Sequence, residues 1–240
     1  MTTTRADATS LQTYARIAGI LFLISMVAGG FGEYYAPTTL IVQGDATATA
    51  ANIVAHDSFF RMGFAAYLVE AVCDIALSLV FYRLLRPVQK DVALLAAFFG
   101  LVSTAVFAVC ELFYFAPSLI LGGADYLKTF SPDQLNTLSL LSLKLYGYGG
   151  MIFLGFYGIA TGIRAYLIYQ SGYLPRFLGV IMGLAGLGFV LKNLTVVLAP
   201  AYASDFFILP MMVSGLTFTV WMLAKGVDVR KVEARAAIVG

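Results

Sequence analysis

The sequence predicts an all-helical membrane protein, a polytopic helical bundle with six transmembrane helices. Apolar residues make up 60% of its 240 residues and charged residues 12%, where soluble globular proteins have roughly 45–50% and roughly 25%. The mean hydropathy is +0.88, and the apolar residues stand in long blocks instead of alternating with polar ones. A soluble fold of this length could not bury that much apolar surface. We therefore expect one integral membrane domain over residues 1–240, in contact with the lipid bilayer.

The expected spans follow from the lengths of the apolar blocks. A helix needs about 20 apolar residues to cross roughly 30 Å of hydrocarbon. Each block must be helical, because a strand would leave an unpaired edge in lipid. Six blocks meet these requirements, and the spans predicted from them are Ala15–Tyr35, Phe59–Leu84, Val92–Phe115, Leu145–Ile168, Phe177–Leu198 and Phe206–Ala224.

Two outer loops carry signals for short helices of their own. Asp45 can cap a surface helix over the segment that follows it. Ser131 and Gln134 have the spacing of a capping box, with Pro132 at the first helical position. This pattern predicts a helix that begins outside the membrane and leads into the fourth span.

Spans four and five are distinguished by length and by glycine content. The chain from Leu135 to Tyr169 is too long for one perpendicular span, which predicts a break near residues 147–150 or a strong tilt. Both spans also contain glycines four residues apart, a spacing that allows close helix contact. These favour either packing within one chain or a homodimer through spans four or five, and they are Gly158 with Gly162 and Gly179 with Gly183.

The distribution of Lys and Arg predicts the orientation. Six spans place both termini on one side, and Arg61 and Lys128 fall on the opposite side. Because basic segments are retained in the cytoplasm, we expect a multi-pass protein of the cell membrane with both termini cytoplasmic. The basic residues assigned to the cytoplasmic side are Arg5, Arg16, Arg83, Arg86, Lys90, Arg164, Arg176, Lys225, Arg230, Lys231 and Arg235.

Composition also excludes several classes of function. The formal charge of +2 is too small to indicate a nucleic-acid partner. His56 is the single histidine, and the sequence contains no zinc-protease, phosphate-loop or serine-hydrolase signature. We therefore expect neither a metal nor a cofactor. Cys73 and Cys110 lie inside apolar stretches, which favours small packing residues over a disulfide.

Several segments together resemble a bacterial family of six-span membrane proteins, the domain of unknown function 4386. The resemblance covers nearly the whole chain and supports the count of six spans. It implies no activity. The segments that carry it are ARIAGILFLI from Ala15, LIVQGDATATAANIVAHDSFFRMGF from Leu40, CDIALSLVFYRLLRPV from Cys73, LLAAFFGLV from Leu94, YLIYQSGYLPRFLGV from Tyr166 and the closing WMLAKGV.

Ionisable side chains inside the expected spans are the candidate functional residues, because each costs roughly 2.5–3.5 kcal/mol in the bilayer. Glu70 and Asp74 lie four residues apart and hence on one face of span two. Lys192 is expected to be the cationic partner of Glu111 or of that face. Glu33 and Arg61 complete a polar set that leans toward the outer half of the bundle. The residues proposed to bind a ligand are Glu70, Asp74, Glu111, Lys144 and Lys192.

These residues leave three interpretations open. They form structural ion pairs, a pocket for a ligand, or a path for an ion or proton. The corresponding functions are a membrane protein that binds or moves a small ligand, an intramembrane enzyme acting on a lipid-like substrate, and a purely structural or partner-binding bundle. The absence of any nucleophile–base motif leaves the question of enzymatic activity open.

Overall fold

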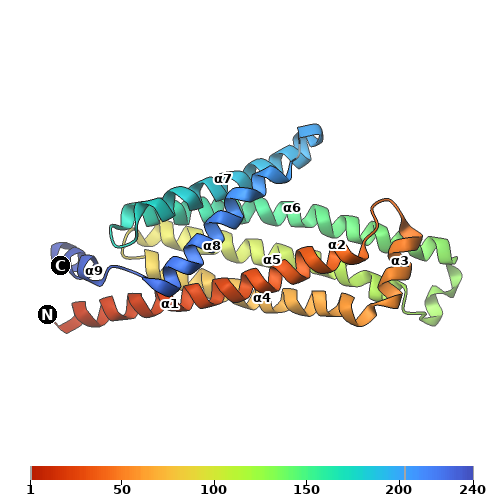
Figure 1. The fold of residues 1–240 in the computed structure, drawn as a ribbon, viewed down its shortest axis with the longest axis horizontal. Helices are drawn as coiled ribbons and strands as arrows, with labels where there is room; N and C mark the ends of the chain where they lie inside the picture. Colours follow the sequence, from red (N-terminus) through yellow and green to blue (C-terminus); the bar gives the residue numbers. More distant parts are fainter. Residues whose placement is uncertain (1, 203, 240) are drawn as a thin grey trace. The chain divides into compact units, whose positions relative to one another are not determined.

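The computed structural model describes residues 2–202 and 204–239, and every regular element in these ranges is helical (Figure 1). One of the short elements is a π-helix and three are 3₁₀ turns. The elements in chain order are α1 (Thr2–Gly29), the π-helix η1 (Gly30–Tyr35), α2 (Ala36–Leu40), α3 (Ala46–Ala55), α4 (Asp57–Leu85), α5 (Lys90–Ile120), η2 (Asp125–Thr129), α6 (Pro132–Ser171), α7 (Arg176–Leu198), η3 (Pro200–Tyr202), η4 (Asp205–Ile208), α8 (Leu209–Ala224) and α9 (Val229–Val239).

Six helical stretches are long and apolar enough to cross a membrane, which confirms the predicted fold class. They overlap all six predicted spans, and side chains such as Val27, Val72 and Leu112 are exposed on them for contact with lipid. The stretches are Thr9–Leu40, Asp57–Leu85, Lys90–Ile120, Pro132–Ser171, Arg176–Leu198 and Phe206–Ala224.

Of the two alternatives predicted for the fourth span, the break is wrong, because α6 continues through residues 147–150 as one helix of 40 residues; the strong tilt stays a prediction. A glycine inside a helix costs only about 1 kcal/mol relative to alanine, and α6 contains no proline after Pro132. At Gly147 and Gly150 an added Cβ would meet nothing within 4 Å. Gly147 and Gly150 therefore mark neither a kink nor a close contact, whereas a Cβ on Gly149 would collide with the side chain of Cys110.

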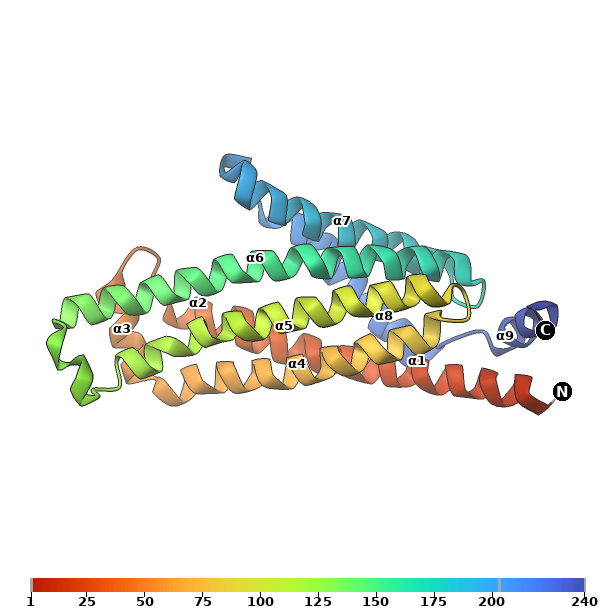
Figure 2. The ribbon, with the colours of Figure 1, turned by 180° about the vertical axis from the view of Figure 1, so that it is seen from behind.

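The chain divides into two compact units. Unit 1 comprises Met1–Ile24, Cys73–Ser103 and Leu154–Gly240, and unit 2 comprises Ser25–Val72 and Thr104–Phe153. Helices α1, α4, α5 and α6 each contribute one part to each unit. The segment of α1 in unit 1 and helix α9 lie at the same end of that unit, as both views show (Figures 1 and 2).

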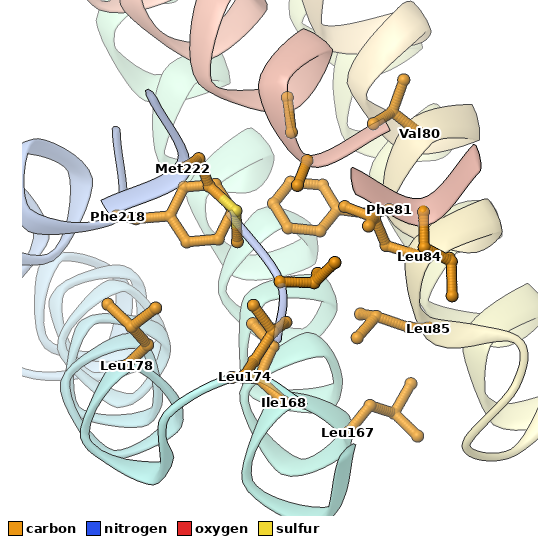
Figure 3. Packing of buried hydrophobic residues seen from close by; sticks show 14 of the residues in the cluster. Val80, Phe81, Leu84, Leu85, Leu167, Ile168, Leu174, Leu178, Phe218 and Met222 are labelled. Carbon is orange, nitrogen blue, oxygen red and sulfur yellow. The ribbon is translucent and has the colours of Figure 1, made fainter. Parts of the chain in front are cut away.

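Unit 1 has a largely aliphatic core. Figure 3 shows its centre, where Phe81 and Phe218 pack with ring centroids 5.3 Å apart beside the fully buried Met222. Leucines and isoleucines of α4, α6 and α7 surround these rings. The most deeply buried of them are Leu84, Leu85, Leu167, Ile168 and Leu178.

Glycines allow α6 and α7 to approach within unit 1. A Cβ on Gly186 would lie 2.8 Å from the carbonyl oxygen of Gly158, and one on Gly158 would lie 2.9 Å from that of Gly186. A Cβ on Gly179 would lie 2.8 Å from the carbonyl oxygen of Ala165. The predicted packing within one chain is confirmed at these positions, since backbone atoms leave no space for a side chain.

Polar side chains of α1 cap the C-terminal end of α8 within unit 1. Gln12 donates to the carbonyl of Lys225 at 3.0 Å and accepts from the N–H of Val227 at 2.8 Å. Arg16 donates to the carbonyls of Met222 and Ala224 at 3.3 and 3.2 Å. A helix leaves its last carbonyls without partners, and α1 supplies donors for three of them.

Unit 2 contains the two loop helices that the sequence predicts. Asp45 accepts from the N–H of Ala48 at 2.9 Å and caps α3, which runs across the direction of α2 (Figure 1). The N–H of Ser131 donates to the Gln134 side chain at 2.8 Å, and the N–H of Gln134 donates back to the Ser131 hydroxyl at 3.3 Å. Both predicted caps are confirmed.

Candidate functional site

Glu33 lies in the π-helix η1, which the sequence analysis did not predict. Pro37 follows four residues later and has no N–H to donate to the carbonyl of Glu33. The helix widens at this point by one residue per turn, a local change often found at functional sites. Thr38 and Thr39 donate their hydroxyls to the carbonyls of Tyr34 and Tyr35 at 2.7 Å each. The run of residues from Pro37 to Thr39 is therefore the sequence signal for this element.

Two glycines bring the π-helix region close to α4. A Cβ on Gly29 would lie 2.7 Å from both carboxylate oxygens of Glu70, and one on Gly32 would lie 2.7 Å from the carbonyl oxygen of Gly63. The Glu70 carboxylate therefore rests against the backbone of α1 inside unit 2. Any larger residue at position 29 would displace it.

Glu111 of α5 is the most deeply buried of these acids, at 3% exposure. Its carboxylate accepts a hydrogen bond from the hydroxyl of Tyr146 on α6 and interacts electrostatically with Glu70. Tyr146 in turn interacts electrostatically with Glu33 and Tyr114. We call these five residues the carboxylate–tyrosine cluster, and four helical elements of unit 2 contribute to it.

Aromatic rings extend around the carboxylate–tyrosine cluster. Tyr114 and Tyr146 meet edge to face with centroids 5.3 Å apart, and Phe107 stacks on Tyr146 at 6.2 Å. Tyr67 contacts Phe107 edge to face at 4.9 Å. Phe60 stacks on Tyr114 at 4.5 Å and its carbonyl accepts from the Tyr114 hydroxyl at 3.3 Å. The carboxylate–tyrosine cluster is thus linked to a network of aromatic rings in unit 2.

The basic residues of unit 2 lie at its surface. Arg61 donates to Asp57 at 2.7 Å, and both side chains are about half exposed. Lys128 pairs with Asp125 at 2.7 Å in the outer loop. Lys144, a predicted ligand-binding residue, is exposed on α6. No contact in unit 2 brings Lys144 among the residues of the carboxylate–tyrosine cluster described above.

The remaining predicted residues belong to unit 1. The boundary between the units falls after Val72, so Asp74 is in unit 1 although Glu70 is in unit 2. Lys192 is buried on α7. The pairing of Lys192 with Glu111 or with the Glu70–Asp74 face stays a prediction.

Arg164 is the functional candidate that sequence reasoning missed. Its assignment to the cytoplasmic turn after span four is wrong, because Arg164 lies within α6 and is only 3% exposed. An arginine near a span end usually extends its side chain to the interface, which explains the error. The available signal was its position, four residues inside the predicted end of span four at Ile168.

The guanidinium of Arg164 is held between three helices of unit 1. One Nη lies 3.5 Å from the hydroxyl of Ser78, and the guanidinium carbon lies 4.7 Å from the centre of the Phe81 ring. A Cβ on Gly100 would lie 2.5 Å from the same Nη. Asp74 interacts with the guanidinium electrostatically. We call these five residues the arginine cluster.

Within the described residues, no three or more His, Cys, Asp or Glu side chains are grouped so that they could hold a metal ion. Cys73 and Cys110 are buried and form no disulfide, in agreement with the predicted packing role. His56 is exposed at the end of α3, with Nδ1 3.0 Å from the carbonyl of Asn52. The buried ionisable groups inside the spans are carboxylates, tyrosines, the two thiols, Lys192 and Arg164.

Six apolar helices that bury ionisable side chains define a multi-pass α-helical membrane protein. The chain belongs to the family described as domain of unknown function 4386, whose model matches residues 17–226. An uncharacterized protein of Archaeoglobus fulgidus is 27% identical over 124 residues, which cover 51% of this chain and 60% of that relative. The chain thus spans less than two thirds of the relative's length. No solved structure matches the chain. These similarities assign no activity.

Proposed function

We propose that this protein binds or moves a small, positively charged ligand within the membrane, with Glu111 as the central contact. The protein is a single integral domain of the cell membrane with cytoplasmic termini. Glu70 belongs to the same unit as Glu111 and joins it in the proposed site, while ligand binding by Asp74, Lys144 or Lys192 stays a separate prediction.

The burial of Glu111 carries this proposal. A carboxylate at 3% exposure inside a membrane helix is costly and calls for a specific role. The hydrogen bond from Tyr146 orients the Glu111 carboxylate, while the negative charges of Glu111 and Glu70 repel each other. A bound cation would relieve that repulsion.

The rings around Glu111 match the same ligand chemistry. The faces of Tyr and Phe attract organic cations, and carboxylates add a full opposite charge. Tyr67, Phe107, Tyr114 and Tyr146 are linked by ring contacts of 4.9 to 6.2 Å. An alkylammonium group is therefore a better fit to this cluster than an anion or a neutral lipid.

Thermal unfolding of the purified protein in an uncharged detergent tests the proposal. Ethylammonium, choline and tetraethylammonium are titrated against NaCl at equal ionic strength. A ligand that binds only the folded state raises the unfolding midpoint, so at least one amine should raise it above the NaCl series. Glu111→Gln should abolish the rise, because the amide still accepts from Tyr146 but carries no charge.

The matched control is Ser118→Ala, a buried change two turns further along α5 in unit 2. It should retain the response to the amine. Equal midpoints in every amine and in NaCl would contradict the proposed ligand class. A rise that persists unchanged in Glu111→Gln would contradict the proposed site.

The proposed orientation is tested separately by labelling with a membrane-impermeant maleimide. Asp125→Cys should react from outside intact cells, and Gln89→Cys should react only after the membrane is opened. The unsubstituted chain is the control, because Cys73 and Cys110 are buried.

The mass of the protein–detergent particle tests the proposed homodimer through spans four or five. Gly158, Gly179 and Gly186 already contact backbone atoms within the chain, so a dimer would have to use other residues of these spans.

A further inference from the structure

The guanidinium of Arg164 does not follow the usual pattern for a basic residue near a span end. Arg164 is seven residues from the end of α6, and Ser78 is seven residues from the end of α4. At 1.5 Å per residue both lie about 10 Å inside those helix ends. The side chain is nevertheless buried against Ser78 and Phe81 instead of extending to water.

Within the part of the chain that the structure describes, the contacts of the guanidinium leave one donor, the buried Nε–H, unused and another in a long hydrogen bond. Arginine has five N–H donors in a planar fork. One donates to Ser78 at 3.5 Å, the long limit for a hydrogen bond, and the buried Nε has no hydrogen-bond partner among the described residues. Phe81 covers one face of the group at 4.7 Å but accepts no conventional hydrogen bond. The arginine cluster therefore retains a donor that an oxygen atom could use.

The surroundings restrict what could bind there. Ser78 is 2% exposed and adds a hydroxyl beside the guanidinium. Gly100 lets the backbone of α5 come close, since a Cβ there would lie 2.5 Å from Nη and 2.7 Å from the Ser78 hydroxyl. Asp74 offsets part of the positive charge electrostatically without supplying the Nε–H with an acceptor. A small group with two coplanar oxygens fits the fork best.

We propose that the arginine cluster of unit 1 is an anion-binding site, in which Arg164 and Ser78 receive a carboxylate or phosphate group. The group belongs either to a small free anion or to the headgroup of an anionic lipid, because both present the same oxygens. The site is separate from the carboxylate–tyrosine cluster, and it does not depend on the proposed binding of a cation.

Thermal unfolding of the full chain in dodecyl maltoside tests this site. The midpoint is measured with increasing sodium phosphate or sodium acetate, with NaCl at equal ionic strength as the reference, and with added phosphatidylglycerol or phosphatidylcholine. A rise with phosphate or acetate identifies a free anion. A rise with phosphatidylglycerol alone identifies a lipid headgroup. The proposal would be overturned if phosphate, acetate and phosphatidylglycerol all left the unfolding midpoint at the value of their references.

Variants test whether an anion that raises the unfolding midpoint binds at Arg164 and Ser78. Arg164→Lys keeps the charge but loses the planar fork of donors, and it should lower the affinity for the anion at least tenfold. Because that variant moves a buried charge and its packing, Ser78→Ala is the deciding one: it leaves all charged side chains unchanged and should weaken binding about fivefold, the equivalent of one hydrogen bond. Arg176→Gln, at the start of α7 against the ring of Tyr169, is the matched control and should respond like the unsubstituted chain. Loss of the rise in Arg176→Gln, or an unchanged affinity in Ser78→Ala, would place the anion elsewhere and refute the proposal.

Discussion

The two units bury ionisable groups in opposite ways. Unit 1 surrounds one guanidinium with an aliphatic core, one ring face and a carboxylate that acts through space. Unit 2 gathers three carboxylates among aromatic rings, with a tyrosine hydroxyl as donor to one of them. A guanidinium keeps its proton in a protein, whereas a carboxylate can take one up and become neutral. The first unit must therefore stabilise a permanent charge, and the second can adapt its charge to what is bound.

The largest expected effect distinguishes the buried guanidinium of unit 1 from the buried carboxylates of unit 2. Arg164→Met should lower the free energy of unfolding by about 3–5 kcal/mol, because Asp74 and Ser78 lose a buried charged partner. Glu111→Gln should change it by less than about 1 kcal/mol, since the amide oxygen still accepts from Tyr146. Thermal and denaturant unfolding in detergent measure both.

A double substitution sharpens the same comparison. Asp74→Asn combined with Arg164→Met should recover part of the loss, because no uncompensated charge remains. A double variant less stable than the sum of its parts would contradict the electrostatic coupling within the arginine cluster.

The next effect tests the close packing in unit 1. Gly186→Val should cost about 2–3 kcal/mol, because the new side chain meets the backbone of Gly158 and Gly162 at 2.8 Å. Gly162→Ala is the control, because a Cβ there meets nothing within 4 Å. Its higher helix propensity should make it neutral or stabilising by up to about 1 kcal/mol. Equal losses in the two variants would argue against tight contact between α6 and α7.

A smaller effect is expected at the end of α8. Gln12→Leu removes two hydrogen bonds and should cost about 1–2 kcal/mol. Thr13→Ala, whose hydroxyl donates only to a carbonyl of its own helix, should cost little. Unfolding midpoints of the two variants side by side measure the difference.

The smallest effect belongs to the outer loop of unit 2. Ser131→Ala removes the acceptor of the capping box and should cost about 1 kcal/mol. Thr137→Ala, within the first turns of α6, should be neutral, because its hydroxyl bonds to its own helix. A loss in Thr137→Ala as large as in Ser131→Ala would show that the cap contributes nothing specific.

Helices and caps were predictable because their signals are local. Apolar blocks, Asp45 and the Ser131–Gln134 box each act over a few residues, and the structure confirms them. Arg164 was not placed correctly, because its surroundings depend on other helices: Ser78 and Gly100 lie more than 60 residues away in sequence. The π-helix was predictable in principle from Pro37, whereas the division between Glu70 and Asp74 was not.

The contacts between α1 and α8 also constrain how the protein is made. Gln12 and Arg16 are synthesised early, and their backbone partners follow 206 to 215 residues later. At 5–20 residues per second this interval is roughly 10–40 s. Throughout this interval, Gln12 and Arg16 lack these partners, which lie at the end of α8 and in the segment directly after it. Unit 1 therefore completes its contacts at the end of translation, and a chain that stops before Val227 leaves the side-chain oxygen of Gln12 without its backbone N–H donor.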